Sequence, residues 1–451
     1  MCPLWPLHII LLYMLSLAPV WFAACHLTTK QTKAVPRNTK PSMTVLFNPP
    51  VVSDLIVSET TKVNFSFAPT NGFEGYNLSC LVSNIDIANT GQIQILKEDN
   101  GLVQGSFNVS GSYLGHTSIK LCLKDPYKGT DCELTSNELV VHVIRKPRVV
   151  DHIFTVTVVI LVAVIFVNFG CTLDTNRLKD AVVRPIGPLI GLVCHFLILP
   201  LVSYGLGYYF FPDSPTLRLG LFFTGIAPAG GASNIWTFTL GGNLDLSITM
   251  TAVSTLASFA FIPLWVLTLG GTIFAERQME VPFQKLFSSG VTPLICLCIG
   301  FGIQVYFKRI SAFMVRFLKL FSVLLIAFII CFAVITNFYL FKFFSWQIIL
   351  GGMLLPWIGY LSGWVFSYLL NQSDENKLAI TIETGVQNTG ISIFLLRTCL
   401  PQPDSDITTV VPVSVALMTP IPLVLFSILK RMRGKTHRPK LAVSDTEILN
   451  S

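Results

Sequence analysis

The sequence has little charge for its length. Asp, Glu, Lys and Arg together make up 12% of the 451 residues, and hydrophobic residues make up 52%. Soluble globular domains usually carry about 25% charged residues. This composition excludes an ordinary soluble protein and indicates several membrane spans. The net charge of +7 does not indicate nucleic-acid binding, because many of the basic residues stand at the ends of apolar runs.

Signatures of common catalytic and metal sites are also missing. The sequence has no Walker A loop, no nucleophile elbow and no Cys/His metal spacing. Six of the eleven cysteines lie in or beside apolar runs, where cysteine is usually a small buried hydrophobe. These six are Cys171, Cys194, Cys296, Cys298, Cys331 and Cys399. The sequence therefore predicts that the protein is not an enzyme.

Residues 1–24 are typical of a signal peptide. "HIILLYMLSL" supplies an apolar core, and "WFAAC" supplies small residues for cleavage. Because Lys and Arg are missing before the apolar core, an uncleaved signal anchor is the alternative.

Residues 25–150 are predicted to form an extracellular β-sandwich. Six short β-rich runs, among them "KVNFSF" and "ELVVHVI", alternate with turns. Three sequons in this segment predict N-glycosylation at Asn64, Asn77 and Asn108. Cys80, Cys122 and Cys132 are an odd set, to which Cys25 could add a fourth member. A Cys122–Cys132 hairpin bridge and a Cys80–Cys122 bridge both fit this spacing.

Residues 151–430 are predicted to be a nine-span transporter domain, and 431–451 a cytoplasmic tail. The apolar segments are about 153–171, 186–209, 217–240, 246–271, 288–306, 318–339, 347–370, 377–398 and 408–429. The basic loops and tail place the C-terminus in the cytoplasm and the 400–407 loop outside. The sequon at Asn371 would then face the cytoplasm and stay unmodified.

Two of these segments are predicted to be broken helices. "APAGGASN" in the third segment contains Pro228, Gly230 and Gly231, and "IETGVQNTG" in the eighth contains Gly385 and Gly390. If the fifth span is a hinge, the broken segments are the third of each four-span unit. Corresponding interrupted helices in two inverted repeats are typical of a midplane site in a secondary transporter.

Glu383 lies in the second broken segment and needs a partner. A carboxylate at membrane depth costs about 2.5–3.5 kcal/mol on insertion scales. No Lys or Arg lies in the middle of the other apolar segments, so a bound cation or a proton would serve. Ser247 and Thr251 share one helical face and add oxygen atoms. Taken singly, they are more often bonded to their own backbone.

The sequence resembles the sodium/bile acid cotransporter family over about 151–430, in the branch with a large N-terminal ectodomain. The resemblance is carried by "APAGGASN", "NLDLSITMT", "ETGVQNT" and "GCTLDTNRLKDAVVRPIGPLIG". It implies a panel domain, a core with two crossing broken helices, and two sodium sites. One site would use Ser233, Asn234, Ser247, Thr251 and Glu383. The other would use Glu383, Gln387 and the backbone carbonyls of Thr384 and Val386.

One position departs from the family pattern. His195 precedes Phe196 where the family usually has a glutamine that helps to hold the second sodium. His195, with Asn388, is therefore a possible modulator of the second site, which would make sodium binding pH-dependent. The alternative is that His195 makes a hydrogen bond between helices.

The sequence-based hypothesis is a sodium-coupled symporter of the plasma membrane that works by alternating access. The resemblance implies a bile acid or steroid conjugate as the amphipathic organic anion. Membrane lipid is the other expected partner, and neither nucleic acid nor an organic cofactor is expected. A transport-inactive receptor on a transporter core is the alternative, and a sodium/proton antiporter is a variant of the first hypothesis.

Overall fold

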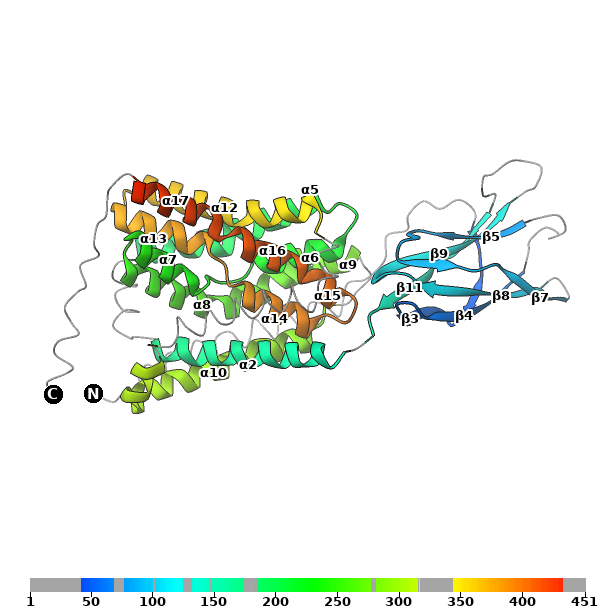
Figure 1. Ribbon diagram of the computed structural model, residues 1–451, viewed down its shortest axis with the longest axis horizontal. Coiled ribbons are helices and arrows are strands. Elements are labelled where there is room, and N and C mark those ends of the chain that lie inside the picture. Colours follow the sequence, from blue (N-terminus) through cyan, green and yellow to red (C-terminus); the bar gives the residue numbers. More distant parts are fainter. Residues whose placement is uncertain are drawn as a thin grey trace. The chain divides into compact units, whose positions relative to one another are not determined.

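The computed structural model describes residues 42–68, 77–99, 102–124, 132, 134–146, 148–172, 183, 185–276, 281–314, 316 and 344–432. The chain divides into two compact units (Figure 1). The strand unit lies within 32–151 and includes 401–404, and the helical unit holds the rest of the described chain. The predicted leader, Cys25, the 318–339 segment and the tail beyond Met432 lie outside the described residues.

The strand unit contains two sheets. The first has the order β1-β10-β9-β11-β3, with β5 also paired to β9. The second has the order β2-β4-β8-β6, with β7 also paired to β8. The bounds are β1 Ser42–Met43, β2 Leu46–Asn48, β3 Val51–Ile56, β4 Thr60–Phe67, β5 Asn77–Val82, β6 Ala88–Thr90, β7 Gln94–Asp99, β8 Leu102–Gly111, β9 Gly115–Lys124, β10 Leu134–Ser136 and β11 Leu139–Ile144.

The two sheets share one apolar core. Along β4, Val63 and Phe65 are buried whereas Asn64 between them is exposed, as the two-residue period of a strand requires. Leu121 of β9 and Val141 of β11 belong to the same core from the other sheet. The strands therefore form a sandwich, with each sheet buried on one face.

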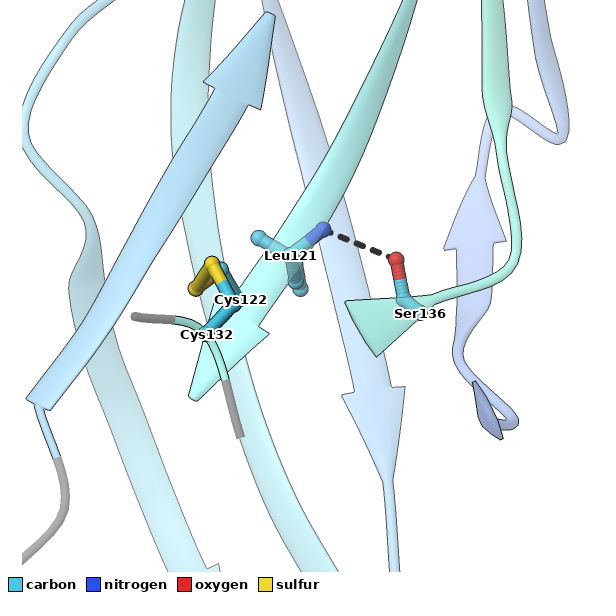
Figure 2. The surroundings of a disulfide bond; sticks show 4 residues. All are labelled: Leu121, Cys122, Cys132 and Ser136. Carbon is cyan, nitrogen blue, oxygen red and sulfur yellow. Dashed lines mark hydrogen bonds between the residues drawn. A yellow bond between two sulfur atoms is a disulfide. The ribbon is translucent and has the colours of Figure 1, made fainter. Parts of the chain in front are cut away.

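A disulfide joins Cys122 at the end of β9 to Cys132, and their Cα atoms lie 5.6 Å apart. Figure 2 shows this bridge beside Leu121, whose backbone N–H donates to the Ser136 hydroxyl at 2.8 Å. Cys80 is a free thiol. Of the two pairings that the spacing allowed, the structure therefore has the Cys122–Cys132 hairpin bridge.

The described helices run from residue 149 to residue 432. Their bounds are α2 Val149–Thr172, α4 Ile186–Val193, η2 Cys194–Ile198, α5 Leu199–Phe210, α6 Pro215–Gly225, α7 Ala232–Leu240, α8 Leu244–Trp265, η3 Val266–Gly270, α9 Gly271–Glu276, α10 Phe283–Tyr306, α12 Trp346–Leu369, α13 Asp374–Gly385, α14 Thr389–Cys399, α15 Asp404–Thr408, α16 Val410–Met418 and α17 Pro420–Met432. The segments η2 and η3 are π-helical turns inside longer helices.

Five helices in the described residues are long and apolar enough to cross a membrane. They are Ile186–Phe210, Leu244–Glu276, Phe283–Tyr306, Trp346–Leu369 and Asp404–Lys430. The protein is therefore a multi-pass membrane protein. The predicted first segment contains a shorter apolar helix, Val156–Cys171, and the third and eighth segments are each split into two short helices. Since the sixth segment lies outside the described residues, nine spans remain a prediction.

Candidate functional site

Both predicted breaks are present in the helical unit. The third segment stops being helical between Gly225, the end of α6, and Ala232, the start of α7. Pro228 lies in this break, where it removes a backbone donor. The eighth segment is interrupted between Gly385 and Thr389. Each break therefore separates two short helices, α6 from α7 and α13 from α14.

The two breaks lie against each other through main-chain atoms. The Gly230 N–H donates to the Val386 carbonyl at 2.8 Å, and the Asn388 N–H donates to the Pro228 carbonyl at 2.9 Å. A Cβ atom at Gly230 would lie 2.7 Å from the Gln387 carbonyl oxygen. A glycine is therefore required for this approach. Part of the backbone freed by the breaks is satisfied by this pairing rather than by a ligand.

Glu383 lies in the last turn of α13, and its side chain is fully buried. The Ser247 hydroxyl donates to Oε2 at 2.8 Å, and the Thr251 hydroxyl donates to Oε1. Both donors lie on one face of α8, as their four-residue spacing predicts. Among the described residues, no Lys, Arg or His forms an ion pair with this carboxylate. Within the described part of the chain, the hydrogen bonds to this carboxylate thus come from neutral hydroxyl groups.

Two further oxygen atoms from α7 complete this group. The Ser233 hydroxyl lies near the Glu383 carboxylate, but among the described residues its Oγ has no hydrogen bond of ordinary geometry. Asn234 donates from Nδ2 to the Thr251 Oγ1 at 3.3 Å. The Asn234 Oδ1 is buried and has no partner in the described chain. Buried polar atoms are nearly always hydrogen-bonded, so these two oxygens are candidates for ligand binding.

In the predicted second set of ligands, two of the main-chain oxygens already contact other parts of the protein. The Gln387 side chain is 5% exposed, and neither its oxygen nor its nitrogen has a partner among the described residues. The Val386 carbonyl already accepts the Gly230 N–H, and the Thr384 carbonyl oxygen lies against Gly359 of α12. The Asn388 Oδ1 caps α14 by accepting the Ile391 N–H at 3.1 Å. The structure therefore assembles the first set more completely than the second.

His195 reaches the same region from the π-helical turn η2. Its ring is 1% exposed, and its Nε2 lies 3.0 Å from the Glu383 backbone oxygen. A carbonyl can only accept, so Nε2 carries the proton. The imidazole thus makes the hydrogen bond between helices that was the alternative to a ligand role.

Pro200 explains the π-helical turn that carries His195. Proline has no N–H to donate to the carbonyl four residues earlier, which is that of Phe196. The Trp265 indole N–H donates to this freed carbonyl at 2.8 Å. Such turns are frequent at functional sites, because one extra residue per turn redirects a side chain.

Sequence reasoning missed two residues beside the site. Thr237 of α7 is fully buried, and its Oγ1 lies 3.3 Å from the Ser247 Oγ. Trp265 holds the η2 turn as described above. Thr237 lies three residues after Asn234, so it shares the α7 face of that predicted ligand. That spacing was the available signal, but threonine in an apolar helix is more often bonded to its own backbone.

The chemistry of this group suits a small hard cation. Carboxylate, hydroxyl and amide oxygens are the ligands that such ions prefer. The C-terminal turn of α13 adds partial negative charge beside Glu383. The described residues contain no group of three or more His, Cys, Asp and Glu side chains that could hold a metal ion. The donors therefore match sodium better than a transition metal.

A small apolar pocket lies between α2, α8, α10 and α14. Its free volume is about 40 Å³, and Ser258 supplies the one hydroxyl among its lining residues. Phe166, Phe259, Ile262, Leu286, Phe394 and Leu395 form most of its wall. This volume is far below the roughly 300–1,000 Å³ of ordinary ligand pockets. An organic molecule could enter only if these helices separated.

The helical part of the chain is similar in sequence to known proteins. Residues 159–343 match the model of the Sodium Bile acid symporter family. The chain is 31% identical over 258 residues to the sodium-dependent organic anion transporter of Bos taurus, covering 55% of this chain and 65% of that protein. It is 28% identical over 261 residues to the human P3 protein, covering 57% of this chain and 54% of that protein. It is 26% identical over 257 residues to the hepatic sodium/bile acid cotransporter of Rattus norvegicus, covering 56% of this chain and 70% of that protein.

These relatives are matched over part of their length. The alignments span 65% of the organic anion transporter and 54% of the P3 protein, and they leave close to half of this chain unmatched. The matched family consists of transporters rather than enzymes. Residues 159–343 of the chain are therefore similar to the sodium bile acid symporter family.

Proposed function

We propose that this protein is a sodium-coupled symporter of an amphipathic organic anion. The observation that carries the proposal is the buried Glu383 carboxylate, which has hydroxyl and amide oxygens around it and no ion pair among the described residues. A sodium ion beside it would compensate a charge that is otherwise expensive in a membrane. The names of the relatives support sodium-dependent organic anion transport.

Sodium would bind first to the oxygens of Ser233, Asn234, Ser247, Thr251 and Glu383. These residues come from α7, α8 and α13, so a bound ion would join three helices. Glu383, Gln387 and the carbonyls of Thr384 and Val386 are the proposed second set. The hydrogen bond that the Val386 carbonyl already accepts from the Gly230 N–H supports weaker binding there.

The anion is proposed to be a bile acid or steroid conjugate, moved by alternating access. The apolar pocket between α2, α8, α10 and α14 is too small for such an anion in this structure. Since the pocket holds about 40 Å³, helix separation has to precede entry. Plasma-membrane location, an outside sandwich and a cytoplasmic C-terminus complete the proposal and rest on the sequons and on the basic loops.

The deciding experiment is uptake of labelled steroid sulfates and conjugated bile acids by cells that display the protein at their surface. We expect uptake in sodium medium and loss of uptake when choline replaces sodium. Cells displaying the Glu383→Gln variant at an equal surface level provide the matched control. A surface-displayed wild type that takes up no member of the panel, and whose stability does not respond to sodium, would favour the receptor alternative.

A further inference from the structure

Two hydrogen-bonded chains of side chains converge on the Glu383 carboxylate. One runs from Asn234 through Thr251 to Oε1, and the other runs from Thr237 through Ser247 to Oε2. Both chains begin on α7, pass through α8 and end on α13. Asn234 and Thr237 are three residues apart, so they lie on one face of α7. Thr237 is thus the first residue of one hydrogen-bonded series, as the proposed ligand Asn234 is of the other series.

The direction of the protons in the second chain follows from chemistry. An ionised carboxylate only accepts hydrogen bonds, and a serine hydroxyl has one proton to donate. Ser247 gives its proton to the Glu383 Oε2 at 2.8 Å. At the 3.3 Å contact between Thr237 and Ser247, Thr237 is therefore the donor.

This donation fixes the lone pairs of the Ser247 oxygen. One lone pair accepts the Thr237 proton, and the O–H bond points at Glu383, so the remaining lone pair has one direction left. Thr237 and Ser247 are both fully buried. Without the Thr237 hydroxyl, the Ser247 oxygen loses the contact that orients it.

We infer that Thr237 is a positioning residue for the sodium site, which it serves through Ser247 without touching the ion. The inference rests on the proposed function, because it assigns Ser247 to sodium. It explains why a buried threonine of α7 turns its hydroxyl toward α8. Thr239, on the same helix, instead donates to the Ile235 carbonyl of its own backbone at 2.7 Å.

The test compares three variants of the purified full-length chain in detergent. Thr237→Val keeps the shape and removes the donor, Thr237→Ser keeps the donor, and Thr239→Val is the matched control. Each protein is unfolded by heat over a sodium series in which choline keeps the ionic strength constant. The readout is the sodium concentration that gives half of the maximal stabilisation.

We expect Thr237→Val to raise this sodium concentration about 3- to 10-fold, which is the effect of one oriented hydrogen bond. Thr237→Ser should remain within about twofold of wild type, and Thr239→Val should not differ from it. Unfolding temperatures in choline alone check that all variants are folded. A merely structural threonine would change those temperatures and leave the sodium midpoint in place.

Three results overturn the inference. If Thr237→Val has the sodium midpoint of wild type while wild type responds to sodium, Thr237 does not orient a ligand and the proposed function stands. If Thr237→Val and Thr237→Ser are shifted equally, the hydroxyl is not the cause. If wild type itself shows no stabilisation by sodium over choline, the proposed function fails and the inference fails with it.

Discussion

At the scale of single residues, Glu383 determines what the crossing of the two breaks can bind. Its carboxylate is fully buried and is held by the hydroxyls of Ser247 and Thr251. Hydroxyl dipoles stabilise an ionised carboxylate less than a neighbouring cation does in a low dielectric. Charge, more than shape, is therefore the reason that we propose this position as a cation site.

Glu383→Gln should abolish stabilisation by sodium, moving the half-stabilising concentration by more than tenfold. The amide keeps the volume and an oxygen but removes the charge that offsets dehydration of the ion. The measurement is the sodium series of thermal unfolding in detergent. Glu375→Gln, at an exposed position in the first turn of α13, is the matched control and should behave as wild type. An unchanged sodium response in Glu383→Gln would remove Glu383 from the site.

Cys80 gives a residue-scale prediction for the strand unit. Burial raises the pKa of the Cys80 thiol to about 11, from 9.0 for an ordinary thiol. The thiolate is the reactive form, so at pH 8 only about 0.1% of this thiol is reactive, against about 10% for an ordinary thiol of pKa 9. Maleimide labelling at pH 8 should therefore be slow in the folded protein and faster as pH rises toward 11.

The labelling is measured by mass spectrometry of the peptide that contains Cys80. The same peptide from protein unfolded in guanidinium, without reductant, is the control and should react at the ordinary rate. Rapid labelling of the folded protein at pH 8 would contradict the burial of this thiol.

At the scale of elements, the crossing of α6–α7 with α13–α14 depends on close main-chain approach. Gly230→Ala should destabilise the helical unit by about 1–3 kcal/mol, because its Cβ would lie 2.7 Å from the Gln387 carbonyl oxygen. Gly205→Ala in α5 is the matched control, since a Cβ there meets nothing within 4 Å. Alanine favours a helix by about 1 kcal/mol over glycine, so this control should be neutral or stabilised. Thermal unfolding in detergent measures the stability of the two variants. Equal destabilisation of Gly230→Ala and Gly205→Ala would refute the close crossing.

The strands show which parts of the fold the sequence predicts. Alternating runs such as 62–67 and 117–123 predicted β4 and β9, because six or more residues display a two-residue period. The strands β1, β2, β6 and β10 have two or three residues, too few to display any period. Their formation depends on neighbouring strands that a local pattern does not reveal.

Some features of the candidate site were likewise predictable from the sequence, and others were not. The breaks were predictable from proline and glycine, and the Ser247–Thr251 pair was predictable from its spacing. The pairing of Gly230 with Val386 was not, because it joins main-chain atoms of residues far apart in sequence. The orientation of the His195 ring toward the Glu383 carbonyl was not predictable either, because it depends on a π-helical turn. Pro200 favours such a turn without determining what the side chain meets.

At the scale of the whole molecule, the sequons provide a test of topology. Asn64, Asn77 and Asn108 lie on strands, and all three side chains are exposed. An exposed sequon on the lumenal side of the membrane is open to glycosylation. We expect glycosidase treatment to increase the mobility of the wild type in gels.

The variant in which Gln replaces all three asparagines should show no such change. Asn371→Gln is the matched control: that asparagine is exposed but is predicted to face the cytoplasm, so the variant should shift as much as wild type. A wild type without any mobility change would contradict the predicted topology or the use of these sites.

The joint between the two broken helices has a consequence for redesign. It is made by the main-chain N–H groups of Gly230 and Asn388 and the carbonyls of Val386 and Pro228, and of these positions Gly230 has no room for a side chain. The side chains proposed to bind the ion take no part in these main-chain hydrogen bonds. A substitution of the Gln387 side chain, a proposed ligand, leaves these main-chain hydrogen bonds available, so the proposed ligands can be varied without removing the bonds that hold the two breaks together.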